Sequence, residues 1–321
     1  MNAVPHRRLG RTELQVPVVA FGAGPVSGLM TGDDQALQLA VIQRAVASGI
    51  HWFDTAAGYG QGTSESNLGR CLSILPQADM LHIATKVRVE FVNHGSLQQQ
   101  IFEGLHRSLE RLKRKSVTLL QLHNGITKQR NDEPFSIAAE DLAAGSEIVE
   151  SLLELKKSGL VKFIGLTGTG CATSLRTVIR SGVFDTIQIP YNLLNPSAGQ
   201  EVDNKRLDRN YGNLLADSLQ MDMGAFAIRI FAGGALLGRA ASAHTLTTPF
   251  FPLELYRQDV IQSVFLRREY GLNVLIQRAI TFALRHPAIH SAIIGFGTSQ
   301  EVEAAANSTH GLARTSSTTS Q

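Results

Sequence analysis

The feature that most constrains this chain is a regular alternation of short apolar runs with longer stretches of helical periodicity. The runs are rich in Val, Ile and Phe, whereas the stretches between them carry apolar residues at spacings of three and four. This alternation is typical of βα units, in which helices cover a parallel sheet. The predicted strands are Pro17–Phe21, Ile50–Asp54, Leu81–Lys86, Val117–His123, Val161–Thr167, Thr186–Pro190, Ala225–Ile230 and Ala288–Ile294. Eight such strands suffice to close a barrel, so the sequence predicts a (β/α)8 TIM barrel.

The helical stretches between these runs have recognisable ends. Gly49 and Gly159 stand where two helices should stop, and Lys156 and Lys157 lie in a last turn, where the helix dipole favours cations. The clearest helices are expected at Asp34–Ser48, Ser96–Leu112 and Ser146–Ser158. Weaker patterns predict helices at Glu65–Ile74, Thr173–Ser181, Tyr211–Leu219, Val274–Leu284 and Gln300–Asn307. Each predicted strand is therefore followed by a helix.

A single domain is expected at residues 8–309, although 321 residues would suggest two ordinary domains. The alternative is an open doubly wound sheet, which needs a glycine-rich phosphate loop after its first strand. The only candidate for that loop is Gly22-Ala23-Gly24, and its third glycine is out of place. Arg8–Val16 should form a short polar hairpin at the barrel floor. The polar tail, residues 310–321, is expected to be disordered.

Composition argues against several classes of partner. The formal net charge of +3 is too small and scattered to indicate nucleic-acid binding, and no window is apolar enough for a membrane helix. Two cysteines, Cys71 and Cys171, are far fewer than a disulfide-stabilised secreted domain carries, and no signal peptide is visible. No metal-ligand cluster is evident among the ten histidines. We expect a cytoplasmic protein, monomeric or a small homo-oligomer, that acts on small molecules.

Three connections are unusually long, namely Asn124–Gly145, Tyr191–Asn210 and Phe231–Leu272. All three follow strands, so they should open on the face where barrels of this kind hold their sites. Long loops there commonly form pocket walls. The last of them should contribute an apolar lining from Phe250, Phe251, Leu253, Leu255 and Tyr256.

Ionisable side chains stand at the ends of three consecutive predicted strands. Asp54 ends the second strand, Lys86 the third and His123 the fourth, while Tyr59 follows Asp54 in Gly58-Tyr59-Gly60. Each residue alone commonly has a structural role, such as a helix cap, a solvated strand end or a packed ring. Because the carboxyl ends of barrel strands share one rim, the four together indicate a catalytic site.

These four residue types suit proton exchange with a carbonyl oxygen. A tyrosine hydroxyl titrates near ~10 in water, and an adjacent ammonium should lower that pKa by stabilising the phenolate. Asp54 is expected to hold Lys86 against Tyr59 through a buried ion pair, and the imidazole of His123 can share the proton. The set lacks a source of hydride, so a cofactor must supply it.

The sequence resembles the aldo-keto reductase superfamily from about Arg8 to about Asn307. In that family the order Asp, Tyr, Lys, His forms a catalytic tetrad, which corresponds here to Asp54, Tyr59, Lys86 and His123. The surrounding segments are also similar, among them Phe53-Asp54-Thr55-Ala56 and Glu65-Ser66-Asn67-Leu68-Gly69. The resemblance implies a nicotinamide-dependent oxidoreductase.

The resemblance also implies a set of cofactor contacts. Thr167 and Gly168 replace the Ser-Asn pair that often contacts the nicotinamide carboxamide, and Gln188 matches the glutamine for the same group. Ile228 falls where an aromatic residue usually stacks on the nicotinamide, and Arg229 follows as a contact to the pyrophosphate or a substrate hydroxyl, or as a structural ion-pair partner. The complete set of expected contacts is Gly22, Thr167, Gly168, Gln188, Ile228, Arg229, Gly233, Gly295, Gly297, Gln300 and Glu301.

Glu301 bears on the choice between NAD and NADP. The stretch Gly295–Glu301 contains no cation, and Glu301 lies where NADP-using members often have Arg. A carboxylate repels a 2′-phosphate but accepts a hydrogen bond from a ribose hydroxyl, which predicts NAD over NADP. A cation reaching in from a long loop would reverse this expectation. An NAD preference favours the oxidation direction, and the overall look of the motifs resembles members that oxidise aldoses at C1, such as the threo-aldose and galactose dehydrogenases.

Three functions follow from these observations. The leading one is hydride transfer between NAD, or else NADP, and an aldose or small aldehyde. The second is a nicotinamide-binding regulatory subunit with little turnover, like the potassium-channel β relatives of the family. The third is a barrel hydrolase or lyase that pairs Asp54 with Glu65 or Glu90.

Overall fold

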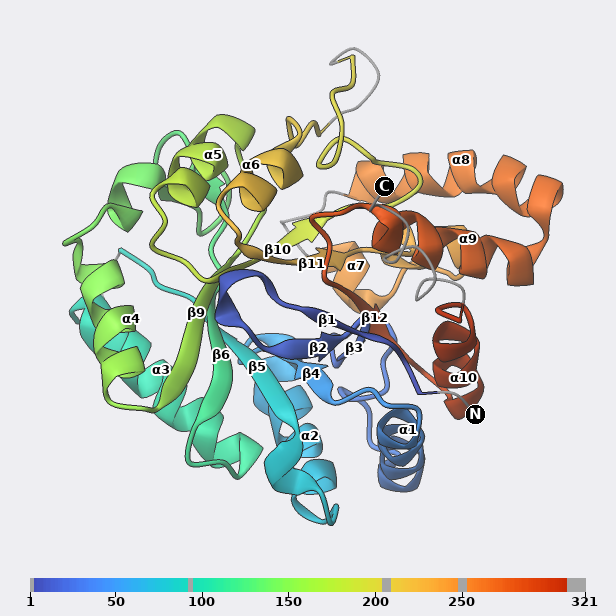
Figure 1. Cartoon of the computed structure of the whole chain (residues 1–321), viewed down its shortest axis with the longest axis horizontal. Coiled ribbons are helices and arrows are strands. Elements are labelled where there is room, and N and C mark those ends of the chain that lie inside the picture. Colours follow the sequence, from blue (N-terminus) through green and yellow to red (C-terminus); the bar gives the residue numbers. More distant parts are fainter. Residues whose placement is uncertain (1–2, 92–94, 204–208, 248–252, 311–321) are drawn as a thin grey trace, which may run out of the picture.

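A closed barrel of eight parallel strands forms the centre of the computed structural model, which describes residues 3–91, 95–203, 209–247 and 253–310. The strands are β3 (Val19–Gly22), β4 (Trp52–Asp54), β5 (His82–Val87), β6 (Val117–Leu122), β9 (Val161–Thr167), β10 (Thr186–Pro190), β11 (Gly224–Ile228) and β12 (Ser291–Gly295). Neighbours run in the order β10-β11-β12-β3-β4-β5-β6-β9, which confirms the (β/α)8 barrel and excludes the open sheet (Figure 1). The expected polar tail lies outside the described residues from 311 onward.

The eight predicted helices are all present, with no end displaced by more than three residues. They are α1 (Gln35–Ala47), α2 (Thr63–Ser73), α3 (Leu97–Leu112), α4 (Glu147–Lys157), α5 (Ala172–Arg180), α6 (Leu214–Gln220), α9 (Leu272–Arg285) and α10 (Ser299–Asn307). The side chains of Asp34, Ser96 and Ser146 accept backbone hydrogen bonds at the starts of α1, α3 and α4. Gly159 follows α4 with φ of 79°, a conformation that favours glycine. Local capping chemistry thus sets several helix ends.

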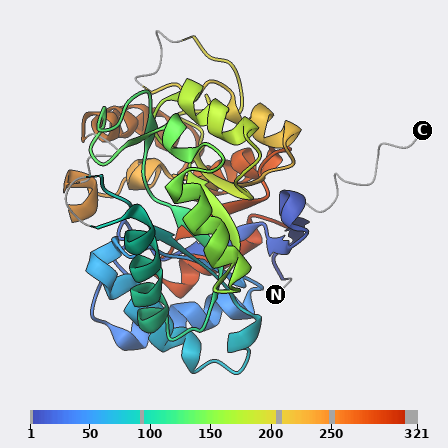
Figure 2. The ribbon, with the colours of Figure 1, turned by 90° about the vertical axis from the view of Figure 1, so that its left-hand side faces the viewer.

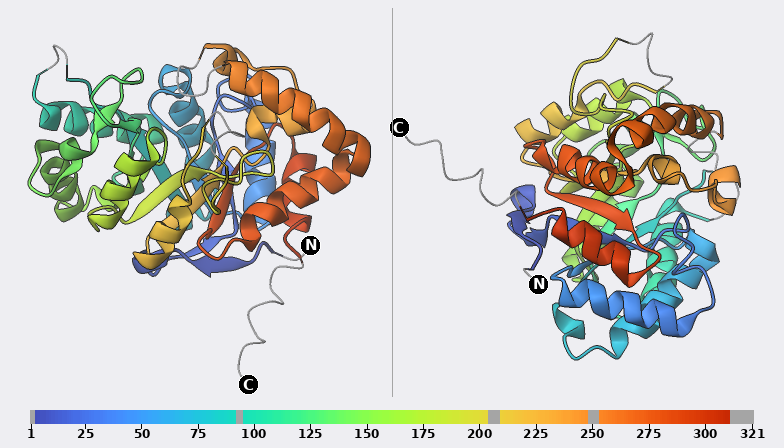
Figure 3. Two further views of the ribbon diagram at one scale, coloured as in Figure 1. Left: turned by 90° about the horizontal axis from the view of Figure 1, so that it is seen from above. Right: turned by 90° about the vertical axis from the view of Figure 1, so that its right-hand side faces the viewer.

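The connection predicted at Phe231–Leu272 is not a plain loop. It contains the 3-10 segment η6 (Ala232–Leu237), a short helix α7 (Ala243–Thr247) and the long helix α8 (Leu253–Tyr270). Only Tyr256 and Ser263 of α8 are buried, and its apolar residues are spread around the whole helix. No one-sided pattern therefore marked α8 in the sequence. Figure 3 shows α8 and α9 side by side on the outside of the barrel.

The amino-terminal hairpin covers the barrel floor, as predicted. Its strands β1 (His6–Arg8) and β2 (Gln15–Pro17) pair antiparallel. The hairpin therefore begins two residues before the predicted start at Arg8. Leu9 and Val16 are fully buried against Trp52 and Phe226 of the barrel strands. This apolar floor closes the end of the barrel opposite the strands' carboxyl ends.

The helices form a continuous outer layer. Figure 2 shows α3 and α4 lying over the strands of the same side, where α3 contacts β5 and α4 contacts β9. The last helix, α10, packs against α1 (Figure 3). Arg44 of α1 forms an ion pair of 3.2 Å with Glu303 of α10. No helix among the described residues is long and apolar enough to cross a membrane.

A buried ion pair joins α2 to α3. The carboxylate of Glu65 is fully buried and lies 2.7 Å from the guanidinium of Arg111, while the Thr85 hydroxyl donates to its other oxygen at 2.5 Å. A Cβ on Gly69 would approach the Arg111 carbonyl oxygen to 2.4 Å, so glycine is required where the two helices meet. The segment Glu65-Ser66-Asn67-Leu68-Gly69 is therefore explained by helix packing.

Replacing Arg111 by Met should lower the free energy of unfolding by about 3 kcal/mol, because a buried carboxylate loses its charged partner. Urea unfolding followed by the fluorescence of the single tryptophan, Trp52, measures the change.

Arg107→Met is the matched control on the same helix. Its ion pair with Glu103 is exposed at 58% and 51%, so its loss should change the free energy of unfolding by less than about 1 kcal/mol. Equal effects of the two substitutions would contradict the structural role assigned to Glu65.

Candidate active site

A pocket of about 430 Å³ opens at the carboxyl ends of the barrel strands. Asp54 is the last residue of β4, Lys86 lies in β5, and His123 follows the last residue of β6. Tyr59 begins the 3-10 turn η2 (Tyr59–Gly62) between β4 and α2. Asp54, Tyr59 and His123 line the pocket, and Lys86 lies behind Tyr59. The structure thus brings the four predicted residues together.

A buried ion pair holds Lys86 in place. Its ammonium lies 2.5 Å from one carboxylate oxygen of Asp54, and both side chains are at most 4% exposed. The same ammonium donates to the carbonyl oxygen of Thr55 at 2.8 Å and to the Tyr59 hydroxyl at 3.3 Å. Burial alone would lower the pKa of Lys86, but Asp54 and Tyr59 together raise it above its ordinary value. Lys86 is therefore a permanent cation beside the Tyr59 hydroxyl.

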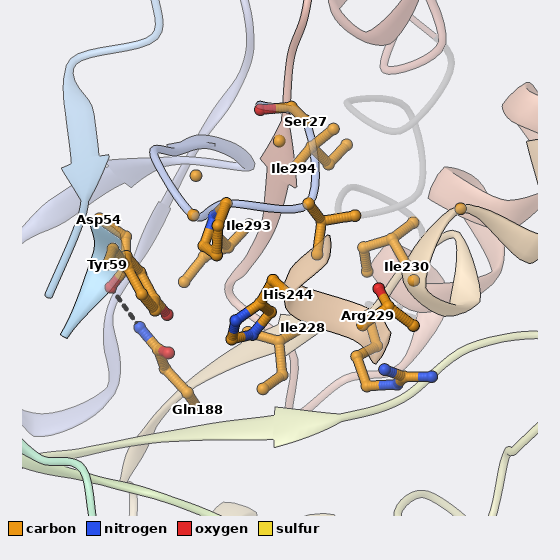
Figure 4. A pocket seen from close by; sticks show the side chains of 18 of the residues that line it. Ser27, Asp54, Tyr59, Gln188, Ile228, Arg229, Ile230, His244, Ile293 and Ile294 are labelled. Atoms are coloured by element: carbon orange, nitrogen blue, oxygen red, sulfur yellow. Dashed lines mark hydrogen bonds between the residues drawn. The ribbon is translucent and has the colours of Figure 1, made fainter. Parts of the chain in front are cut away.

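The second carboxylate oxygen of Asp54 accepts two side-chain amides. Gln121 of β6 donates to it at 3.1 Å, and Gln188 of β10 donates to it as well (Figure 4). The resemblance assigned Gln188 to the nicotinamide, whereas here its amide nitrogen contacts Asp54. Gln121 was not predicted, although a polar residue within the apolar run Leu119-Leu120-Gln121-Leu122 was the available signal. The two amides fix the orientation of the carboxylate.

The pKa of Tyr59 is shifted in the direction opposite to the sequence-based expectation. Burial raises the pKa above its ordinary value of 10.0, and the nearby charge of Lys86 offsets only part of this increase. The sequence-based expectation took account of the nearby ammonium but not of the loss of solvent around the hydroxyl, which raises the pKa. Tyr59 is therefore a neutral phenol at neutral pH, which is the form that can donate a proton.

His123 packs edge-on against Tyr59, with ring centroids 5.7 Å apart. Burial, with the charges of Lys86, Arg88 and His244 adding to it, holds the pKa of His123 well below 6.5. The imidazole is consequently neutral and suited to hydrogen bonding rather than to charge stabilisation. Arg88 and His244 line the same pocket and were missed, because nothing in the local sequence marks them.

Seven of the eleven expected cofactor contacts lie on the pocket wall. Those that line it are Gly22, Thr167, Gln188, Ile228, Arg229, Gly233 and Gly295. Gly168 is buried behind the wall, where its amide donates to the Gln188 carbonyl at 2.6 Å. Gly297, Gln300 and Glu301 are also outside the lining, at the start of α10.

The pocket wall fits a nicotinamide dinucleotide. The hydroxyl oxygens of Thr167 and Ser27 are buried and have no hydrogen-bond partner among the described residues, so they are available to a polar ligand. A Cβ on Gly22 would approach the Ile293 side chain to 3.0 Å, and the glycine keeps the pocket wall thin there. The guanidinium of Arg229, which also lines the pocket, would hold the pyrophosphate of such a cofactor.

Much of the wall between the polar ends is aliphatic. Figure 4 shows Ile228 beside the His244 ring between Tyr59 and Arg229, with Ile230 near Arg229 and Ile294 near Ser27. Ile228, the last residue of β11, lines the pocket with an aliphatic side chain. Arg229 also forms an ion pair of 3.2 Å with Asp259 of α8, which realises the structural role considered for it while keeping it on the pocket wall.

A cation does approach Glu301, contrary to the impression given by its local sequence. Arg239, from the connection after β11, forms an ion pair with Glu301, whose other oxygen accepts the Gly297 amide at 2.7 Å. Arg239 lines the pocket, and the Tyr256 hydroxyl donates to its carbonyl oxygen at 2.6 Å. The cation near Glu301 thus comes from one of the long connections, an outcome that the sequence allowed. Its charge is balanced by Glu301 itself.

The long connections contribute unequally to the pocket. From the first connection, Phe135 lines the pocket. None of the described residues of 191–210, the second connection, does so. The third connection contributes Phe231, Gly233, Gly234, Leu237, Arg239, His244 and Thr245. The expected apolar lining is wrong for Leu253, Leu255 and Tyr256, which lie on α8 and are not among the residues that line the cavity. Phe250 and Phe251 lie outside the described residues.

Paired carboxylates for hydrolysis are not found on this wall. Among the described residues that line the pocket, Asp54 has the only carboxylate, and Lys86 neutralises it. Glu65 faces Arg111, and Glu90 is also outside the lining. Within the described parts of the chain, no three His, Cys, Asp or Glu residues are grouped to hold a metal ion.

Known proteins of one family resemble this chain. A match to L-galactose dehydrogenase of Arabidopsis thaliana is 32% identical over 172 residues and spans 52% of this chain and 50% of that protein. D-threo-aldose 1-dehydrogenase of a Pseudomonas species is 28% identical over 219 residues, which span 59% of this chain and 61% of the relative. Protein tas of Escherichia coli is 26% identical over 96% of this chain and 92% of its own length.

Solved structures and a family model agree with these relatives. An aldo-keto reductase from Bacillus halodurans, in its holo form, superposes with a TM-score of 0.67 at 21% identity, covering 95% of this chain and 90% of that structure. The model of the Aldo/keto reductase family matches residues 19–315. The protein described here belongs to the aldo/keto reductase family.

Proposed function

We propose that this chain transfers a hydride between a nicotinamide dinucleotide and a carbonyl or alcohol carbon, with an aldose C1 or a small aldehyde as substrate. The observation that carries the proposal is the Tyr59 hydroxyl, which lies 3.3 Å from the buried ammonium of Lys86 on the wall of a pocket. We assign the rest of the pocket wall, which includes Gln188, Thr167 and Arg229, to binding of the dinucleotide. Asp54, Tyr59, Lys86 and His123 are the proposed catalytic set.

In the reduction direction, Tyr59 donates its proton to the carbonyl oxygen. Lys86 stabilises the phenolate that forms, and Asp54 keeps the ammonium oriented. His123, neutral at physiological pH, holds the substrate oxygen by a hydrogen bond. When bound, the reduced nicotinamide supplies the hydride to the carbonyl carbon.

The relatives support the proposed substrate class. Two are named for aldose or galactose oxidation, and an Escherichia coli relative, 26% identical over 63% of this chain, is named as an NADH-specific methylglyoxal reductase. These names favour a sugar hemiacetal or a small aldehyde. They also favour NAD in at least one case.

NAD remains the proposed cofactor because the Arg239 charge is already balanced. A 2′-phosphate at this position would have to displace Glu301 from Arg239 and would face the carboxylate itself. A ribose hydroxyl could instead donate to Glu301 without breaking the pair. The proposed oxidation direction rests on this preference and on the relatives named as dehydrogenases, whereas a protonated Tyr59 favours reduction at neutral pH.

Replacing Tyr59 by Phe should reduce kcat by at least about a hundredfold, because the proton donor is removed. Fluorescence titration with NADH should show nearly unchanged nucleotide affinity. A wild-type protein that binds NADH but turns over no aldehyde or aldose would contradict the enzymatic proposal and favour a nicotinamide-binding regulatory protein.

The pH dependence should follow the raised pKa of Tyr59. Reduction needs the phenol, so kcat/KM for an aldehyde should stay level from about pH 7 to about pH 9 and fall only above about pH 10. Oxidation needs the phenolate and should accelerate about tenfold per pH unit over the same range. The pKa of His123 is too low to add an inflection near pH 6.5. A loss of reduction between about pH 7 and about pH 8 would argue against Tyr59 as the acid.

Replacing Glu301 by Gln should tighten NADP binding about tenfold, because Arg239 becomes available to the 2′-phosphate. The glutamine carbonyl can still accept the Gly297 amide, which preserves the local fold. The ratio of the dissociation constants for NADPH and NADH measures the effect.

Glu303→Gln is the matched control for this substitution. Glu303 lies on the same helix and pairs with Arg44 instead, so the cofactor ratio should not change. Tighter binding of NADP than of NAD by the unmodified protein would overturn the proposed preference.

A further inference from the structure

Helix α8 leaves two large apolar side chains in solvent. Ile261 is 64% exposed and Phe265 is 69% exposed, and they lie four residues apart near the middle of the helix. Residues at this spacing are neighbours on one face of a helix, so the two side chains form a single apolar patch. Figures 1 and 3 show α8 at the outer edge of the molecule. Apolar side chains grouped on such a surface are typical of a protein interaction site.

The packing of α8 on the rest of the chain does not use this apolar patch. Tyr256 and Ser263 are its buried residues, and the Tyr256 hydroxyl donates to the Arg239 carbonyl oxygen at 2.6 Å. Arg267 donates to the Ala235 carbonyl oxygen at 2.6 Å from the same side of the helix. At 3.6 residues per turn, these anchoring residues lie opposite the patch. Substitutions within the patch should therefore leave α8 in place.

Exposed charged side chains extend the patch along the helix in both directions. Glu254 and Arg257 precede it, and Arg268 follows it. In an α-helix, these three residues and the two of the patch lie within about 80° of the circumference. We call this set the α8 stripe, which consists of Glu254, Arg257, Ile261, Phe265 and Arg268.

The α8 stripe is complementary to itself when its direction is reversed. Glu254 stands seven residues before Ile261, and Arg268 stands seven residues after it. Arg257 and Phe265 stand four residues before and four residues after the same centre. In an antiparallel pair of α8 helices centred on Ile261, each Glu254 would face Arg268 of the other helix, and each Arg257 would face Phe265. A surface that complements itself in this way is what a two-fold interface between identical chains requires.

We propose that the α8 stripe is a dimer interface, in which α8 packs antiparallel against α8 of a second copy of this chain. Ile261 meets its own counterpart at the two-fold axis. On each side of the axis follow a contact between a guanidinium and the Phe265 ring and then an ion pair between Glu254 and Arg268. Aromatic and arginine side chains are enriched in protein interfaces, and both are present in this stripe. The inference is independent of the proposed oxidoreductase function.

The ion pair within the stripe does not prevent this association. Arg257 lies 3.5 Å from Glu254, and the two side chains are 65% and 67% exposed. An exposed pair of this kind is weak, and the carboxylate retains the capacity to accept from a second guanidinium. Because one helix from each copy makes a small interface, we expect a dissociation constant of about 10 to 100 µM.

Sedimentation velocity between about 1 and about 500 µM should show a monomer–dimer equilibrium. Ile261→Glu should weaken the association at least about tenfold, because two carboxylates would meet at the axis. Ile74→Glu is the matched control, since Ile74 is 62% exposed at the end of α2, outside the stripe, and it should leave the dissociation constant unchanged. An unmodified protein that stays monomeric over this range would overturn the proposal and leave the stripe to a different partner.

Two charge reversals test the register and the symmetry of the pairing. Glu254→Lys and Arg268→Glu should each weaken self-association about tenfold, because both ion pairs of the dimer become repulsive. In an equimolar mixture of the two variants, both charge pairs of the mixed dimer are attractive again. The mixture should therefore dimerise within about threefold of the unmodified protein.

Circular dichroism of each variant checks that it is folded. A mixture that recovers no association would overturn the antiparallel pairing. Dimerisation that none of these substitutions changes would place the interface on another surface and would equally overturn the proposal.

Discussion

The catalytic end of the pocket depends on the buried ion pair between Lys86 and Asp54. Two charges removed from water are stable only when their remaining hydrogen-bonding capacity is satisfied. Thr55 accepts from the ammonium, and the amides of Gln121 and Gln188 donate to the carboxylate. These groups come from β4, β5, β6 and β10, whose carboxyl ends meet only because the barrel closes. The fold therefore makes the ion pair possible, and the pair in turn orients the groups that face Tyr59.

The protonation state of Tyr59 depends on opposing effects on its pKa, and the two members of the Lys86–Asp54 ion pair act in opposite directions. Burial opposes the phenolate, and Lys86 favours it, but Asp54 also disfavours ionisation because its negative charge lies nearby. The neutral phenol is thus the resting form, and the ammonium acts mainly on the phenolate once a proton has left. Such an arrangement stabilises charge where it develops during the reaction instead of in the resting state.

Local sequence predicted what depends on local chemistry. The ends of β9 and β10 were predicted without error, because apolar runs and turn residues mark them, and the four residues at the strand ends were found for the same reason. Helix α8 was missed because its stability comes from contacts with η6, not from a one-sided apolar pattern. The pairing of Arg239 with Glu301 joins residues 62 positions apart, and Asn124 reaches both Val89 and Phe135. Glu301 and Arg239, like Val89 and Asn124, become neighbours only once the barrel has formed, because they lie on different βα units.

Two of the arginines that line the pocket are each held by an acidic side chain from a nearby helix. Asp259 on α8 and Glu301 on α10 hold Arg229 and Arg239 against the pocket wall, and all four side chains retain between 17% and 37% exposure. Partly exposed pairs of this kind contribute only about 1 kcal/mol or less to the stability of the fold, so their main effect is to position the guanidinium groups. The acids therefore keep the arginines extended along the pocket wall. The Arg229–Asp259 pair ties α8 to the end of β11, and the Arg239–Glu301 pair ties the connection after β11 to α10, so this part of the pocket wall is preformed.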